Sequence, residues 1–275
     1  MPLVKGQPQY DEDVPQTNQP QANRAALPAD HPSSGNNKTL EVRDLHVSYG
    51  SVKALTGIDF TGETGKIYAI LGMNGSGKST FFKAIMGIVK PHRGEISVCG
   101  TDSLRARKSG LVGYVPQSEE IDHHFPLSVQ DVVMMGRYCF MGPLRIARKA
   151  DREAVDHALE VVGLTHLRDR RIGALSGGQR KRAFVARAVA QGAQLMLLDE
   201  PFAGVDFTSQ EVITELLVKL AADGKTLLVS THDLESARGF ADEAALLNRT
   251  IVAHGQPEEM LRPENLARAF TKAGN

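Results

Sequence analysis

The sequence predicts an α/β fold in which strands and helices alternate around a parallel sheet, with a helical insert in the middle of the chain. Short apolar runs at 65–72, 194–200 and 225–233 have the length of buried strands and are separated by segments with helical periodicity. Apolar runs of this length are typical of parallel strands that are covered on both faces. From about Ser128 to Ala190 the pattern is helical, which predicts a helical unit inserted into the sheet protein.

The ordered chain begins near Thr39. Two segments, at 40–50 and 52–60, alternate apolar and polar residues, and we expect both to be strands. Further strands are expected at 65–72, 94–100, 111–117, 194–200 and 225–233, and a helix from Lys78 to about Ile88.

One amphipathic helix is expected inside the insert, at 152–163. Its predicted buried face consists of Ala154, Val155, Ala158, Leu159 and Val162. Gly163 follows the last of these residues, where glycine commonly ends a helix.

The first 37 residues differ in composition from the rest. Proline, glutamine and asparagine are frequent there and large apolar residues are scarce, so this segment has too little apolar surface to fold. We predict a disordered tail at 1–37 and a folded domain at 38–275. Cys99 and Cys139 lack a paired spacing, and we expect free, partly buried thiols.

Charge and hydropathy limit the classes of function. The chain has 32 Lys+Arg and 32 Asp+Glu, which argues against a main role on a nucleic-acid backbone. No apolar run approaches the roughly 20 residues that span a bilayer, and the N-terminal residues lack the apolar core of a secretory signal. We therefore expect a cytosolic protein that a partner holds at any membrane where it works.

The segment GMNGSGKST, from Gly72 to Thr80, lies between a predicted strand and a predicted helix. Its glycines and Lys-Ser pair have the spacing of a phosphate-binding loop. Backbone N–H groups and the start of the helix can bind phosphate oxygens. Lys78 can reach the β- and γ-phosphates, and the hydroxyl of Ser79 can bind Mg²⁺.

Two carboxylates follow the apolar strand LMLLDE, which ends at Glu200. Ligands of open α/β sheets bind at the carboxyl ends of strands. There Asp199 suits Mg²⁺, and Glu200 can polarise the water that attacks the γ-phosphate.

A second glycine-rich segment, LSGGQ at 175–179, opens another predicted helix. Two consecutive glycines before a helix form a further anion-binding terminus, with Ser176 as an additional donor. One nucleotide does not need two such sites in one chain. Two copies arranged head to tail would use both, because the second site of one copy would cover the phosphates bound by the other.

Taken in order, these motifs resemble those of the ATP-binding subunits of ABC (ATP-binding cassette) transporters, over roughly residues 39–270. GMNGSGKST resembles the Walker A motif, LMLLDE the Walker B motif and LSGGQ the signature motif. The resemblance implies an ABC-type P-loop NTPase core, an N-terminal antiparallel β subdomain, and a helical signature-motif subdomain at about 118–190.

The resemblance also implies roles for single residues. Tyr49 matches an aromatic that stacks on adenine, Gln117 the Q-loop glutamine near Mg²⁺, Asp206 the D-loop aspartate, and His232 the switch histidine. Alone, Tyr49 could be a strand-end aromatic and His232 a structural histidine. The implied catalytic residues are Glu200, His232 and Gln117, and the implied Mg²⁺ residues are Ser79, Gln117 and Asp199. The implied nucleotide-binding residues are Tyr49, Gly72, Asn74, Gly75, Ser76, Gly77, Lys78, Ser79, Thr80, Ser176, Gly177, Gly178, Gln179 and Asp206.

Within the family, the chain looks most like subunits of importers of divalent transition metals. YVPQSEEID, FPLSVQDVVMMGRY and the RKR after LSGGQ carry this likeness and favour the manganese/iron branch over the zinc branch. The expected function is ATP hydrolysis, with ATP and Mg²⁺ as cofactors, that energises import through a membrane permease. Expected partners are a second copy, permease subunits and, indirectly, a solute-binding protein, at the cytoplasmic face of the inner membrane. The alternatives are a zinc importer, a cassette ATPase acting on nucleic acid or ribosomes, and a regulatory module without turnover.

His123 and His124 lie side by side among acidic and apolar residues in EEIDHHFPLSVQD, a stretch that begins two residues after Gln117. Adjacent histidines in an extended loop point to opposite sides, whereas a metal site needs three or four converging ligands. By the resemblance, this region borders the groove that receives a permease helix. We therefore expect a docking edge here rather than a metal site.

Overall fold

The computed structural model describes residues 37–117 and 126–270. The predicted tail at 1–37 lies outside the described residues except for its last residue. Within the two described ranges, no helix has both the length and the apolar character needed to cross a membrane.

An antiparallel sheet of four strands is formed by the first part of the domain. Its order is β2-β1-β4-β5. The strands are β1 (Lys38–Tyr49), β2 (Val52–Glu63), β4 (Arg93–Val98) and β5 (Thr101–Asp102). The alternation that predicted β1 and β2 reflects one buried face, to which Leu40, Val42, Leu55 and Ile58 belong.

A second sheet has six strands in the order β10-β9-β3-β8-β7-β6. They are β3 (Ile67–Leu71), β6 (Val112–Val115), β7 (Leu195–Asp199), β8 (Thr226–Thr231), β9 (Glu243–Asn248) and β10 (Thr250–Gly255). All neighbours are parallel except β9 and β10, which form an antiparallel hairpin. The sequence predicted the parallel strands but not this hairpin at the sheet edge.

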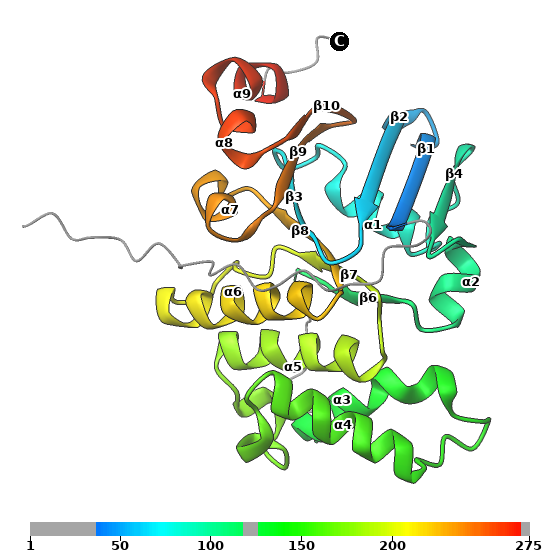
Figure 1. Cartoon of the computed structure of the whole chain (residues 1–275). Coiled ribbons are helices and arrows are strands. Elements are labelled where there is room, and N and C mark those ends of the chain that lie inside the picture. Colours follow the sequence, from blue (N-terminus) through cyan, green and yellow to red (C-terminus); the bar gives the residue numbers. More distant parts are fainter. Residues whose placement is uncertain (1–36, 118–125, 271–275) are drawn as a thin grey trace, which may run out of the picture. The chain divides into compact units, whose positions relative to one another are not determined.

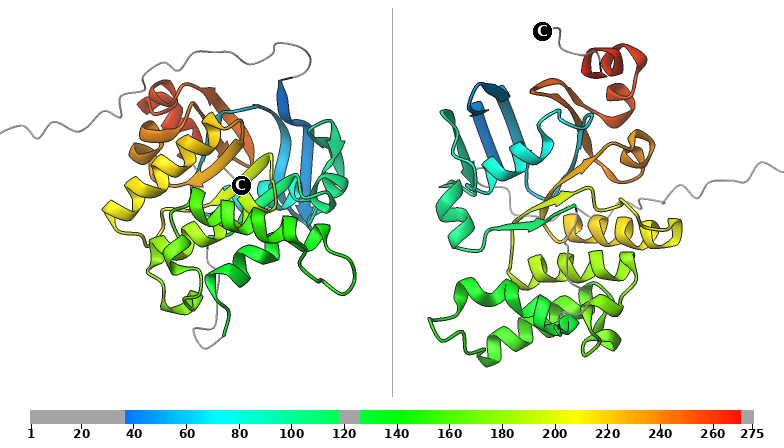
Figure 2. Two further views of the ribbon diagram at one scale, coloured as in Figure 1. Left: turned by 60° about the horizontal axis from the view of Figure 1, so that its bottom comes forward. Right: turned by 180° about the vertical axis from the view of Figure 1, so that it is seen from behind.

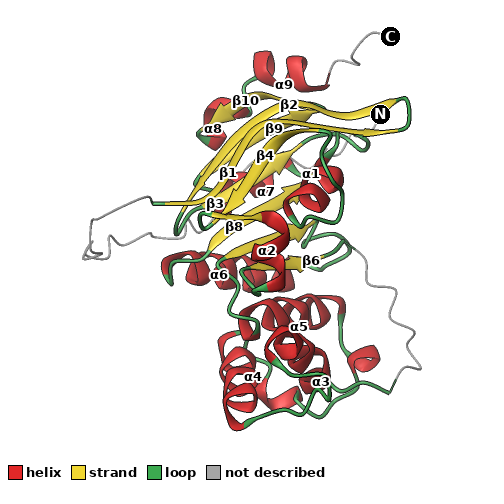
Figure 3. Ribbon diagram, turned by 90° about the vertical axis from the view of Figure 1, so that its right-hand side faces the viewer, coloured by secondary structure: helices red, strands yellow, loops and turns green. Residues whose placement is uncertain are grey.

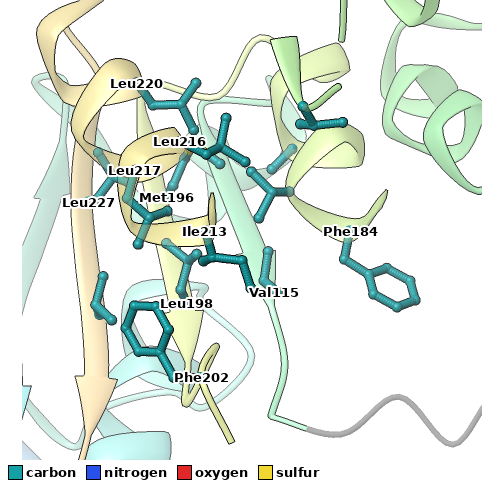
Figure 4. Packing of buried hydrophobic residues seen from close by; sticks show 14 of the residues in the cluster. Val115, Phe184, Met196, Leu198, Phe202, Ile213, Leu216, Leu217, Leu220 and Leu227 are labelled. Atoms are coloured by element: carbon teal, nitrogen blue, oxygen red, sulfur yellow. The ribbon is translucent and has the colours of Figure 1, made fainter. Parts of the chain in front are cut away.

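Both faces of the six-stranded sheet are covered, which explains the continuous apolar runs. One face packs on α1 (Lys78–Ile85), α2 (Ser103–Lys108) and the antiparallel sheet (Figure 1). The other packs on α6 (Phe207–Ala222), α7 (Leu234–Phe240), α8 (Pro257–Met260) and α9 (Pro263–Phe270). In Figure 4, Met196 and Leu198 of β7 lie against Ile213 and Leu217 of α6. Because side chains alternate along a strand, Asp199 faces the α1 side with Leu197.

The helical insert contains α3 (Val129–Met134), α4 (Lys149–Val161) and α5 (Gly177–Ala190). Three 3₁₀ helices, Met135–Phe140, Thr165–Leu167 and Ile172–Ala174, join them. Figures 2 and 3 show α3, α4 and α5 grouped together, apart from the strands. The predicted face of α4 is buried, except that Ala154 is half-buried. Gly163 has φ +67°, as expected of a residue that ends a helix.

Some local predictions were wrong or incomplete. The helix that starts at Lys78 ends at Ile85 instead of Ile88, and Gly87 adopts φ +62°. Helices α2, α6, α7, α8 and α9 were not predicted, although Asp206 caps α6 by accepting a hydrogen bond from the Ser209 N–H. Cys99 and Cys139 are free thiols, but both are exposed instead of partly buried.

A buried ion pair joins three parts of the helical insert. The carboxylate of Asp151 accepts hydrogen bonds from Arg137 Nε and from the backbone N–H of Arg148, both at 3.0 Å. Arg137 also donates to the carbonyl of Ala190 at 2.9 Å, at the end of α5. Side-chain exposure is 17% for Arg137 and 6% for Asp151.

We expect Asp151→Asn to lower the free energy of unfolding by about 2–3 kcal/mol, because Arg137 loses its counter-charge in a poorly hydrated site. The backbone N–H of Arg148 and the Arg137 guanidinium hold the pKa of Asp151 below its usual value of 3.8. The stabilisation is therefore present above about pH 4 and is lost as pH falls through the lowered pKa. Urea unfolding at pH 7 and at acidic pH measures both effects. Asp156→Asn is the control, because Asp156 pairs with Arg168 at the surface, where a pair contributes less than about 1 kcal/mol.

Candidate functional site

The predicted phosphate loop connects β3 to α1. Gly77 forms the N-cap of α1 with φ +105°, and no side chain caps this helix. Gly75 also has a positive φ, +82°. A Cβ at Gly72 would lie 2.4 Å from the carbonyl oxygen of Leu247, so only glycine fits there. The loop therefore leaves the N–H groups at the start of α1 available to an anion.

Lys78 is a buried cation inside this loop. Its Nζ donates to the carbonyl of Gly72 at 2.7 Å and to that of Met73 at 3.2 Å, and the residue is 6% exposed. Burial lowers the pKa of Lys78, while Glu200 and Asp199 act in the opposite direction. The buried Oγ of Ser76 has no hydrogen-bond partner among the described residues. A buried cation and an unused hydroxyl fit a phosphate group.

A pocket of about 280 Å³ opens beside the loop. It is lined by residues from β1, β2, the loop, α1 and the ends of β6 and β7. The lining residues are Tyr49, Val52, Lys53, Ala54, Met73, Asn74, Gly75, Gly77, Lys78, Ser79, Thr80, Gln117, Glu200 and Arg249. The half-exposed ring of Tyr49 thus shares one pocket with the cation and with two of the predicted catalytic side chains.

Asp199 ends β7 and is held on both carboxylate oxygens. Ser230 Oγ donates to Oδ1 at 2.5 Å, and the Tyr114 hydroxyl donates to Oδ2 at 3.4 Å. Burial, followed by the charge of Asp199, raises the pKa of Tyr114 to about 12. The tyrosine therefore stays protonated at neutral pH and remains a donor.

Glu200 turns away from the direction of the strand. It has φ +47°, which is uncommon for a residue with a side chain, and its N–H donates to the Ser230 carbonyl at 3.1 Å. Oε2 of Glu200 accepts a hydrogen bond from Gln117 Nε2 at 3.3 Å and lies 3.0 Å from Nδ1 of His232. The three predicted catalytic residues thus converge on one carboxylate oxygen.

The family can be identified once this geometry is known. Residues 55–203, more than half of the chain, match the family model described as ABC transporter. The chain belongs to the ABC transporter family. It therefore has the ABC ATPase fold and nucleotide-binding domain that its motifs predicted, including the antiparallel sheet and the helical region.

Individual relatives of this ABC ATPase act in metal transport. The manganese transport system ATP-binding protein MntA of Synechocystis is 50% identical over 185 residues, which are 67% of this chain and 71% of the relative. The chelated iron transport system membrane protein YfeB of Yersinia pestis is 48% identical over 185 residues, 67% of this chain and 62% of that protein. Among solved structures, a metal-chelate type ABC transporter in an inward-facing conformation has a TM-score of 0.76 at 33% identity, covering 86% of this chain and 89% of the other.

The signature segment of this ABC ATPase lies away from the pocket. Ser176 and Gln179 form a capping box at the start of α5, with Ser176 Oγ accepting from the Gln179 N–H at 3.2 Å. Gly178 packs so closely on Ser209 that a Cβ would lie 2.5 Å from the Ser209 Cβ, and Gly177 faces the carbonyl of Gly204. The exposed Gly177 and the exposed segment containing Gly204 and Asp206 therefore lie next to each other at the surface, while Gly178 is buried beneath them. Neither Ser176 nor Asp206 lines the pocket.

Among the residues at the site that sequence reasoning missed, four are polar or charged. Ser230 and Tyr114 orient Asp199, while Lys53 and Arg249 line the pocket. Ser230 lies on β8, two residues before the predicted switch histidine His232. This position could have marked Ser230 as a candidate site residue. Arg249 lies in the unpredicted hairpin, where its N–H donates to the Ser76 carbonyl and its own carbonyl accepts from the Thr56 N–H, both at 2.7 Å.

We expect Arg249→Ala to weaken ATP binding about 3- to 10-fold, because the pocket loses a cation whose backbone is tied to the phosphate loop. Titration calorimetry with ATP measures the effect. Arg93→Ala is a control, because Arg93 is an exposed arginine on β4 that pairs with Asp44. Equal affinities of the Arg249→Ala variant and the wild type would exclude a nucleotide contact by Arg249.

The predicted docking edge includes His123 and His124, which lie outside the described ranges. The next residue, Phe125, also lies outside them. Of the following residues, Pro126 is exposed, and Leu127 packs against the core of the helical insert. Among the described residues, no group of three or more His, Cys, Asp or Glu could hold a metal ion.

Proposed function

We propose that this ABC ATPase drives the import of a divalent transition metal, manganese or iron, through a membrane permease. The convergence of Gln117, Glu200 and His232 beside the phosphate loop supports the hydrolytic step. The metal cargo is inferred from the 50% identity to a manganese transport protein and from the likeness to an iron system.

The nucleotide is proposed to lie along the pocket. Adenine would stack on the half-exposed ring of Tyr49 at one end. The phosphates would lie against the N–H groups between Gly75 and Thr80, with Ser76 completing its hydrogen bonding. Lys78 would exchange its two carbonyl contacts for charged phosphate oxygens, which form stronger hydrogen bonds.

Mg²⁺ fits oxygen donors in and beside the pocket: Ser79 and Gln117 line it, and Asp199 precedes the lining residue Glu200 at the end of β7. The hydroxyl of Ser79, the amide oxygen of Gln117 and the carboxylate of Asp199 are the ligand types that this ion prefers. When bound, Mg²⁺ would neutralise charge on the β- and γ-phosphates. Ser230 keeps the Asp199 carboxylate oriented for this role.

Hydrolysis then requires a positioned water. Glu200 would accept a hydrogen bond from the water and remove its proton as the oxygen attacks the γ-phosphorus, while the bond to the ADP oxygen breaks. Gln117 and His232 fix the Glu200 carboxylate through Oε2. His232 is 65% exposed at its side chain and would also contact the γ-phosphate.

A second copy of the chain is proposed to complete each site. Ser176 and Gly177 are exposed at the start of α5, beside the half-buried Gln179 and the buried Gly178, and this segment does not line the nucleotide pocket of its own chain. In a head-to-tail homodimer, this surface would cover the nucleotide of the partner, with the adjacent Asp206 at the same interface. ATP binding would close the dimer and hydrolysis would release it.

We further propose that the complex sits at the cytoplasmic face of the inner membrane. Permease subunits would hold it there, and a solute-binding protein would select the metal. A zinc importer is the alternative. A nucleic-acid partner is not expected, because the chain has zero net charge.

Metal accumulation in a deletion strain tests the cargo. Loss of the gene should lower the uptake of manganese, iron or both, and leave zinc unchanged. Selective loss of zinc would favour the alternative, and unchanged uptake of all three metals would contradict the proposal.

A further inference from the structure

A second pocket, of about 320 Å³, lies between the helical insert and the α1 side of the six-stranded sheet. Its lining includes Tyr114 of β6, Arg107 of α2, Cys139 of the 3₁₀ helix Met135–Phe140, and Arg187 of α5. Arg107 and Tyr114 belong to consecutive elements on the sheet side, whereas Cys139 and Arg187 belong to the helical insert. A change in how the insert packs on the sheet would therefore alter this second pocket.

Tyr114 connects the second pocket with the catalytic carboxylates. Its ring lines that pocket, while its hydroxyl donates to Oδ2 of Asp199. Its backbone carbonyl accepts a hydrogen bond from Arg187 at 3.1 Å. Tyr114 thus contacts an arginine of the second pocket with its backbone and the Walker B aspartate with its side chain.

The two hydrogen bonds to Asp199 differ in length. Ser230 lies on the neighbouring strand β8 and donates at 2.5 Å. The Tyr114 hydroxyl lies at 3.4 Å, which is longer than the roughly 2.7–2.8 Å usual for such bonds. A movement of the ring by about half an ångström would bring this contact to the usual length or break it.

We propose that Tyr114 is a positioning residue for Asp199 and that it transmits changes in the second pocket to this carboxylate. The inference rests on the proposed role of Asp199 toward Mg²⁺. Rotation or displacement of the ring would change the orientation of Oδ2, and with it the affinity for the ion.

The first test compares ATP binding of the full chain in EDTA and at increasing Mg²⁺ concentration. Tyr114→Phe keeps the ring and removes the donor. We expect unchanged ATP affinity in EDTA and a Mg²⁺ concentration for half-maximal enhancement of binding that rises about 3- to 10-fold. Ser230→Ala should act in the same direction. Tyr138→Phe is the matched control. Tyr138 lies on the 3₁₀ helix Met135–Phe140, does not line the second pocket, and contacts Arg145 through its ring.

A Mg²⁺ response of Tyr114→Phe equal to that of the wild type would overturn the positioning role. Failure of the wild type to bind ATP in either condition would instead refute the proposed function itself. The two failures are therefore distinguishable in one titration.

The second test adds bulk to the second pocket through Cys139, an exposed free thiol. In a Cys99→Ser background, a maleimide is attached to Cys139 and the Mg²⁺ titration is repeated with and without Tyr114→Phe. We expect the label to change the half-maximal Mg²⁺ concentration at least about 3-fold when Tyr114 is present, and less than about 1.5-fold in Tyr114→Phe. Cys99 labelled in a Cys139→Ser background is the control. No effect of the label, or equal effects in both backgrounds, would overturn the proposed link.

Discussion

Glu200→Gln will lower steady-state ATP hydrolysis at least about 100-fold while ATP binding is retained. Glutamine has nearly the same shape and keeps an oxygen that can accept from Gln117, but it cannot take a proton from water. The backbone of Glu200 is fixed by its N–H bond to Ser230 and by its unusual φ. The substitution therefore changes the chemistry with little change in geometry. Phosphate release measures turnover, and calorimetry measures binding.

A trapped dimer should accompany this loss. If hydrolysis releases the two copies, the Glu200→Gln variant with Mg·ATP will elute as a dimer in size-exclusion chromatography. Glu211→Gln, on the exposed face of α6, is the control and should turn over normally. Turnover above about a tenth of the wild-type rate would exclude Glu200 as the essential base, because such a residue contributes about 10²- to 10⁴-fold.

Lys78→Ala will weaken ATP binding by about two orders of magnitude. Lys78 is the buried cation of the pocket, and burial already lowers its pKa. In the complex, Lys78 would contact negatively charged phosphate oxygens in place of the two neutral carbonyls that it contacts now. Without this ammonium, the triphosphate loses the one cation that lies within the phosphate-binding segment.

Calorimetry of Lys78→Ala beside Lys83→Ala tests this expectation. Lys83 is exposed on the same helix, so its removal changes the net charge equally and should leave the affinity close to that of the wild type. Equal loss in both variants would indicate a general charge effect and contradict a specific role for Lys78.

The local motifs were predictable because each needs only a few adjacent residues. Gly72 to Gly77 form one loop between β3 and α1, whose first residues are Lys78 to Thr80, and LMLLDE forms one buried strand with two carboxylates at its end. The resemblance to the family then related motifs far apart in the chain, and the pocket does bring Tyr49, Gln117 and Glu200 together.

The contacts between motifs were not predictable, because they depend on strand register and on packing. Tyr114 pairs with Leu197 in the sheet, which brings its hydroxyl to Asp199, and nothing in YVPQ indicates this. Arg249 lies in the turn between β9 and β10, and the pairing of these two strands places it at the pocket. The proposed roles of Ser176 and Asp206 would need a second copy, which the geometry of one chain does not contain.

The central claim is that ATP hydrolysis at Glu200 powers metal import. Uptake of radioactive manganese, measured in a deletion strain that carries either the wild-type chain or Glu200→Gln at equal protein levels, tests it most directly. We predict that the wild type restores uptake and that Glu200→Gln leaves it at the level of the deletion strain. Full uptake with Glu200→Gln, or uptake that does not depend on the chain at all, would contradict the account.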